Sequence, residues 1–243
     1  MAFALLGFIG GQLAALVLTV VAASIAGQGN QLSRIASMAK PPEWYIAVSL
    51  IGLWVGFFGG PWIATKARGT GRLLVDLGVR FRWADLWGLL IGVGGQIVVS
   101  VLYAPFINHL KNFNAPTQKL TGGSHGAGFV LIAVLTVVGA PFFEELFFRG
   151  LLFRALARLF TPAGLGKGTA RAVGVVGAVV VDGLLFGLAH GELEQLAGLA
   201  VFGMILATVS YRTGRLGMNM VSHASFNLVA VLALAGSRGG VLH

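Results

Sequence analysis

The chain has 243 residues, of which 56% are apolar and only 10% are charged, and its mean hydropathy is +0.86. Soluble domains carry about 25% charged residues, so this composition excludes an ordinary water-soluble globular protein. The net charge is +9, but the basic residues lie mainly between apolar segments without zinc-finger spacing or interleaved aromatics, which indicates contact with the lipid bilayer and no nucleic-acid partner.

Apolar segments recur along the whole chain, and a helix needs about 20 apolar residues to cross a bilayer. In chain order, the predicted helices are Ala2–Ala26, Trp44–Thr65, one within Ala84–Leu110, Gly126–Ala140 (ended by Pro141), Phe142–Phe160, Ala172–His190, Leu193–Tyr211 and Leu216–Ala235. The predicted fold class is therefore all-α: a polytopic membrane protein with a bundle of about eight transmembrane helices. We expect residues 1–243 to form a single integral membrane domain, located in the plasma membrane if the source is prokaryotic.

The connecting segments are polar, glycine-rich or basic. The stretch Gly122-Gly123-Ser124 lacks the strand and the Lys of a phosphate-binding loop and is predicted to be a linker. The basic Lys66–Arg82 connector is expected on the cytoplasmic side by the positive-inside rule. With eight crossings, however, Arg154 and Arg171 face outward. This conflict indicates that one apolar segment does not cross completely.

Ionisable side chains inside a membrane cost about 2.5–3.5 kcal/mol each on insertion scales, so they mark partners or function. Residues of this kind gather in the C-terminal half of the chain. Glu145 and Arg149 are four residues apart, so on a helix they share a face and can pair. Glu144 points about 100° away and remains an unpaired acid, as a general base requires. His223 and Asn227 also share a helical face, and both can donate hydrogen bonds to an oxyanion.

Three ordered motifs emerge from this spacing: Glu144-Glu145-x-x-x-Arg149, Phe186-x-x-x-His190 and His223-x-x-x-Asn227. Together they resemble the signature of the CAAX-protease and bacteriocin-processing family, also called the Abi family, which includes the type II prenyl-protein endopeptidases. The resemblance covers roughly residues 129–231, within a region 126–235 that we expect to supply the helices of the active site. The N-terminal helices match only in being apolar.

The resemblance implies an intramembrane endopeptidase whose site lies within the membrane and opens toward the cytoplasm. By this analogy Glu144 activates water with the help of His190, while His223 and Asn227 bind the oxyanion of the tetrahedral intermediate. Glu145, Arg149 and Phe186 are supporting residues. The implied partner is a peptide or protein substrate at the membrane, and Asp182 either orients a site residue or bonds between helices.

Three alternatives remain open from the residues alone. A zinc-dependent version of the protease has Glu144, His190 and His223 as ligands, although Arg149 beside the acids disfavours a cation and no cofactor is the preferred prediction. A non-catalytic membrane scaffold or partner-binding protein uses the same polar network for structure. A transporter or proton relay also places Glu, Asp and His in the membrane, but the polar residues cluster in one half of the chain, which argues against inverted repeats.

Overall fold

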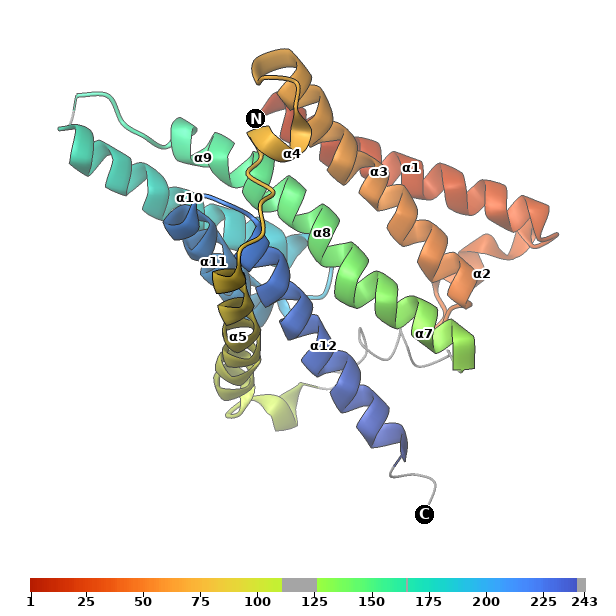
Figure 1. Cartoon of the computed structure of the whole chain (residues 1–243). Coiled ribbons are helices and arrows are strands. Elements are labelled where there is room, and N and C mark those ends of the chain that lie inside the picture. The colour runs from red at the N-terminus through yellow and green to blue at the C-terminus, as the bar shows by residue number, and fades with distance from the viewer. Residues whose placement is uncertain (111–125, 165, 240–243) are drawn as a thin grey trace.

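The computed structural model describes residues 1–110, 126–164 and 166–239, and these residues form helices and connections without any strand (Figure 1). The predicted linker, residues 122–124, lies outside the described residues. The α-helices are α1 (Ala2–Ile25), α2 (Leu32–Ala36), α3 (Glu43–Arg68), α4 (Leu73–Asp76), α5 (Gly88–Tyr103), α7 (Gly126–Val134), α8 (Ala140–Glu145), α9 (Phe153–Leu159), α10 (Lys167–Ala189), α11 (Leu196–Thr213) and α12 (Gly217–Gly239). Short helical turns lie between them: η1 (Gly29–Gln31), η2 (Trp83–Trp87), η3 (Ile107–His109), and the π-helical turns η4 (Leu135–Gly139) and η5 (Leu146–Leu152).

Within the described residues, seven helices are long and apolar enough to cross a membrane, one fewer than predicted. The difference lies in Gly126–Leu159, a single helical stretch of 34 residues where the sequence predicts two helices divided at Pro141. Pro141 lies at the start of α8, directly after η4. A π-helical turn changes the hydrogen-bonding register of the backbone. The helix therefore continues past the proline, although the proline has no N–H to donate.

If each of these seven candidate spans crosses the bilayer once, the conflict over orientation disappears. An odd number places the α3–α5, α9–α10 and α11–α12 connections on one side of the membrane. The basic residues at these connections and the adjoining helix ends are Lys66, Arg68, Arg72, Arg80, Arg82, Arg154, Arg158, Lys167, Arg171, Arg212 and Arg215. The opposite side has a mixture of signs in its described connections, including Glu43, Glu192 and Glu194. From the positive-inside rule we therefore predict that the arginine-rich side and the N-terminus face the cytoplasm.

This orientation can be tested directly because the chain has no cysteine of its own. We expect a single Arg72→Cys variant to react with a membrane-impermeant maleimide only after the membrane is permeabilised. A Ser33→Cys variant, on the opposite side and also exposed, is expected to react in intact cells. Equal labelling of both variants in intact cells contradicts the seven-span topology.

The backbones of α1 and α3 are in close contact. A Cβ atom built on Gly56 collides with backbone atoms of Gly7 and Gly11, and one built on Gly52 collides with Ala15. Because Gly52, Gly56 and Gly60 recur every fourth residue, they form one small-residue face of α3 that lets α1 approach closely. These two helices meet the rest of the molecule through stacked aromatics, with the Phe57 and Phe147 ring centroids 4.4 Å apart.

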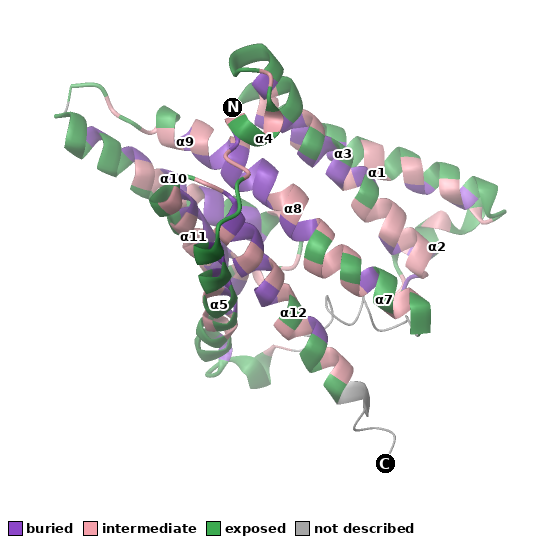
Figure 2. Ribbon diagram, viewed as in Figure 1, coloured by how far each residue is buried: buried purple, intermediate pink, exposed green. Residues whose placement is uncertain are grey.

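The buried residues concentrate where α8, η5, α10, α11 and α12 cross, whereas the outward faces of α1 and α5 are largely exposed (Figure 2). In a bilayer these apolar outward faces are the lipid-facing surface. The polar residues of the three sequence motifs are carried by the crossing helices, so the fold brings them to its centre.

Candidate functional site

The two adjacent glutamates at the end of α8 have different surroundings. Glu145 is completely buried, and its carboxylate accepts hydrogen bonds from Arg149 Nη1 at 3.0 Å and from Asn219 Nδ2 at 3.2 Å. The Glu144 side chain is 13% exposed, and its buried Oε2 has no hydrogen-bond donor. Successive residues of a helix point about 100° apart, which accounts for this division. The structure thus contains the predicted ion pair beside a carboxylate free of hydrogen bonds at Oε2.

Arg149 links three elements of the core. Its Nη2 donates a hydrogen bond to the Gly203 carbonyl of α11 at 3.0 Å, and its Nε lies 3.4 Å from Asp182 Oδ2 on α10. The guanidinium carbon also lies 4.4 Å from the centre of the Phe186 ring. Arg149, Glu145 and Asp182 are all fully buried, so their charges are compensated by each other and not by water. Asp182 therefore forms an ion pair between helices, although neither of its carboxylate oxygens accepts a hydrogen bond.

His223, on α12, connects the two glutamates. Its Nδ1 lies 2.9 Å from Glu145 Oε1, and its Nε2 lies 3.8 Å from Glu144 Oε2. An ionised carboxylate only accepts hydrogen bonds, so Nδ1 carries a proton and donates it to Glu145. His223 lies in the second turn of α12, and this position brings its two ring nitrogens within 4 Å of the two acids.

His190 follows the last residue of α10, and its Nδ1 donates to the Phe186 carbonyl at 2.8 Å, because a carbonyl oxygen can only accept. In the neutral imidazole, Nε2 is then a free acceptor. The Phe186 ring contacts both imidazoles, with centroid distances of 4.8 Å to His190 and 5.5 Å to His223. The Phe186 ring therefore packs against both imidazoles, and the Arg149 guanidinium lies over its face.

Asn227 has a hydrogen bond that the sequence did not predict: its Nδ2 donates to the Thr136 carbonyl in η4 at 2.8 Å. In a π-helical register this carbonyl would accept from the amide of residue 141. Residue 141 is proline, which has no N–H, so the Asn227 side chain supplies the missing donor. One of the two amide protons of Asn227 is thus used structurally, and the other remains available.

Asn219 belongs to the same cluster and was missed by the sequence analysis. It is fully buried and donates to both Glu145 Oε2 and the Leu206 carbonyl, the latter at 2.7 Å. The signal that identifies it is the spacing itself, since Asn219, His223 and Asn227 follow one another at four-residue intervals on one face of α12. Asp182, Phe186 and His190 form a matching series on α10.

A zinc site fits these residues poorly. Among the described residues, no three His, Asp or Glu side chains are arranged to hold a metal ion, so Glu144, His190 and His223 do not form a ligand set. The third acid, Glu145, has its oxygens occupied by donors from Arg149, Asn219 and His223. The positive charge of Arg149 would also repel a divalent cation at this site.

These observations define the class: a polytopic α-helical membrane protein with a carboxylate and imidazole site buried among its C-terminal helices. The family described as type II CAAX prenyl endopeptidase Rce1-like matches residues 126–229, a range that includes all three motifs. This match confirms the resemblance to the CAAX-protease and bacteriocin-processing family and indicates a CAAX-type protease in general. No curated protein and no solved structure matches the chain.

Proposed function

We propose that the protein is an intramembrane endopeptidase that hydrolyses a peptide bond with a water molecule activated by Glu144. The observation that carries this proposal is the contrast between the two glutamates. Glu145 is saturated by three hydrogen-bond donors, whereas Glu144 Oε2 is buried without one and faces the His223 imidazole at 3.8 Å. A buried carboxylate that is held in place but not neutralised is suited to accept a proton from water.

The charges of the cluster support this assignment. Arg149 opposes Glu145 and Asp182. The proposed mechanism requires a proton on each ring nitrogen of His223, so that Nδ1 donates to Glu145 while Nε2, on the side of Glu144, can donate to the substrate. Glu144 is then the single uncompensated negative group. The cluster therefore accommodates one ionised base while its other charges cancel, which limits the cost of burying it.

The reaction follows from these positions. Glu144 takes a proton from water, and the hydroxide oxygen bonds to the peptide carbonyl carbon. The negative charge moves to the carbonyl oxygen, where the Nε2 proton of His223 stabilises it in a site with few competing waters. Glu144 then passes its proton to the leaving amide nitrogen, the C–N bond breaks, and a carboxylic acid and an amine form. The remaining water proton passes from the acid to the amine, so the products leave as a carboxylate and an ammonium group.

His190 and Asn227 have supporting parts in this mechanism. The free Nε2 of His190 accepts a hydrogen bond from the attacking water and orients it toward the peptide. The second amide proton of Asn227 is the other donor to the oxyanion, while the first keeps η4 in place. The mechanism uses no metal or other cofactor, since Glu144 and the two imidazoles supply the proton transfers.

The substrate is proposed to be a peptide or protein segment at the surface of the membrane in which this multi-pass protein resides, the plasma membrane in a prokaryote. The family name points to a prenylated C-terminal peptide as the first one to test. The protein purified in lipid nanodiscs is expected to cleave a farnesylated CAAX peptide, and 1,10-phenanthroline should leave the rate within about twofold because water activation by Glu144 needs no metal.

Cleavage is followed by mass spectrometry of both products, in parallel with Glu144→Gln protein prepared in the same way. Equal cleavage by both preparations indicates a contaminating protease and overturns the assignment. Loss of activity with the chelator, restored by zinc, instead favours the metal-dependent form of the enzyme.

A further inference from the structure

A pocket of about 270 Å³ lies on the arginine-rich side of the protein, away from the buried glutamates. It opens between the connection from α4 to η2, the helix α9 and the turn from α11 to α12. Four arginines from these three segments line it, together with Asp76 and Thr213: Arg80, Arg82, Arg154 and Arg215. We call this site the arginine pocket. Cationic side chains brought together from distant parts of the chain repel one another unless an anion joins them.

Two of the four arginines form the fixed wall of the pocket. Arg154 donates from both terminal nitrogens to the carbonyls of Asp76 and Leu77, each at 2.8 Å. Arg215 pairs with the buried Asp85, but its Nε is itself buried and has no hydrogen-bond acceptor. A buried guanidinium N–H without an acceptor is costly, so Asp85 satisfies the hydrogen-bonding capacity of Arg215 only in part.

The other two arginines are unpaired. Arg80 and Arg82 are exposed, and no described carboxylate lies within ion-pair distance of either one. The single acid of the lining, Asp76, is already engaged, since it accepts from the amide and the hydroxyl of Thr70 at 2.9 and 2.6 Å. The arginine pocket therefore has a clear excess of positive charge.

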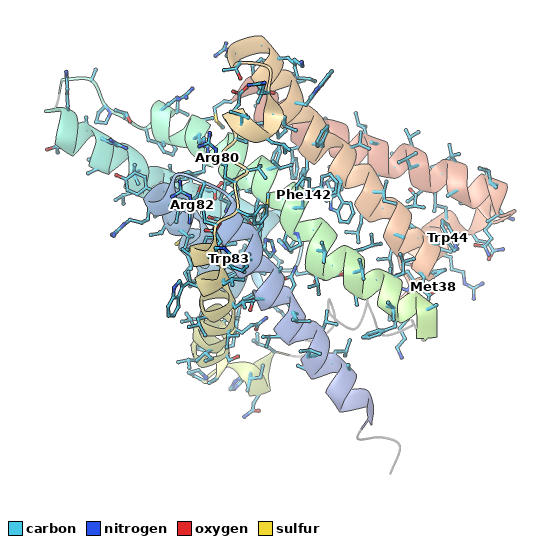
Figure 3. All side chains as sticks on the ribbon, viewed as in Figure 1. Met38, Trp44, Arg80, Arg82, Trp83 and Phe142 are labelled. Atoms are coloured by element: carbon cyan, nitrogen blue, oxygen red, sulfur yellow. The ribbon has the colours of Figure 1, made fainter. Side chains whose placement is uncertain are left out.

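Exposed aromatic residues place this pocket at the membrane surface. Arg80 and Arg82 alternate with Phe81 and Trp83, which are 63% and 88% exposed, and Trp87 on the following turn is 66% exposed. Figure 3 shows Arg80, Arg82 and Trp83 together on the connection between α4 and α5. Tryptophan at the level of lipid headgroups is the usual interfacial anchor of membrane proteins.

We propose that the arginine pocket binds the phosphate group of an anionic lipid headgroup. Guanidinium groups match phosphate oxygens in geometry, and the adjoining aromatics suit the acyl region just below the headgroup. A bound lipid also joins the Arg80–Arg82 segment to the α11–α12 turn, just before the helix that carries His223. The proposal does not depend on the proposed peptidase activity.

The test uses an Arg80→Gln/Arg82→Gln double variant, because both side chains are exposed and neither one forms an ion pair with a described residue. Its control is Arg72→Gln/Arg212→Gln, which removes the same charge from the same side but outside the pocket lining. Lipid binding is measured by native mass spectrometry of detergent-solubilised protein titrated with phosphatidylglycerol or with phosphatidylcholine. Inorganic phosphate is titrated separately, with thermal stability as the readout.

We expect phosphatidylglycerol to bind the wild type more tightly than phosphatidylcholine does. The pocket variant should lose about tenfold in affinity, from the lost charge-assisted hydrogen bonds, while the control loses about twofold. If inorganic phosphate stabilises the wild type but not the pocket variant, the arginine pocket recognises the phosphate group itself, whether it comes from a lipid or from a free ion. Equal losses in the two variants show only general attraction to an anionic surface and overturn the proposal, as does equal binding of the two lipids.

Discussion

Replacing Arg149 with methionine is expected to lower the free energy of unfolding by about 3–5 kcal/mol, because it leaves Asp182 as a buried charge without its ion-pair partner and removes the guanidinium from Glu145. Methionine keeps much of the aliphatic volume but donates nothing to the Gly203 carbonyl. The measurement is a reversible unfolding titration in mixed micelles, followed by tryptophan fluorescence.

A triple variant separates charge from packing. Arg149→Met combined with Glu145→Gln and Asp182→Asn removes all three charges, and we expect it to recover most of the lost stability, since a neutral set with similar volume avoids the desolvation cost. If the single variant is as stable as the wild type, the buried ion cluster does not hold the core together. If the triple variant is no more stable than the single one, packing of the guanidinium on Phe186 is the dominant contribution.

The sequence was sufficient to predict the helical class and the pairing of Glu145 with Arg149. The length of an apolar segment identifies a membrane helix because a segment inside the bilayer must satisfy its backbone hydrogen bonds internally. Four-residue spacing identifies side chains that are neighbours on one helix. The described residues contain seven candidate spans, where the sequence predicted about eight. Pro141 was expected to divide two helices, but the π-helical turn before it, together with the Asn227 side chain, satisfies the backbone there.

Contacts between helices could not be obtained from spacing within one helix. The hydrogen bond from Asn219 to Glu145 joins residues 74 positions apart, and the contact of Arg149 with Asp182 depends on how α10 crosses η5. The same applies to the arginine pocket, since nothing in the local sequence of Arg80 or Arg82 indicates that Arg154 and Arg215 lie beside them. Long-range placement of this kind is set by side-chain packing across the bundle.

Replacing Glu144 with glutamine is expected to reduce peptide cleavage by about 10²–10⁴-fold, the usual contribution of a general base, without a large change in stability. Glutamine has nearly the same shape, and Glu144 Oε2 has no hydrogen bond to lose. Cleavage is measured under single-turnover conditions with the farnesylated peptide, and the unfolding titration is repeated on the same preparation.

The neighbouring glutamate provides the matched control. Glu145→Gln makes the same chemical change one residue further along the helix, but at a carboxylate that accepts from Arg149, Asn219 and His223. A neutral amide has one acceptor oxygen and cannot receive all three donors, so we expect a loss of stability of about 1.5–3 kcal/mol for the charged hydrogen bonds alone. We then expect cleavage to fall for two reasons. Less of the protein is folded, and His223 loses part of the hydrogen bonding that holds it in place.

The two substitutions therefore separate chemistry from structure at adjacent positions. An inactive but stable Glu144→Gln protein beside a destabilised Glu145→Gln protein is the outcome that a free base next to a structural ion pair requires. Glu144→Gln protein that cleaves at the wild-type rate removes the base from the mechanism. The remaining candidate base is then the free Nε2 of His190, and the imidazole that rests on Phe186 becomes the group to replace next.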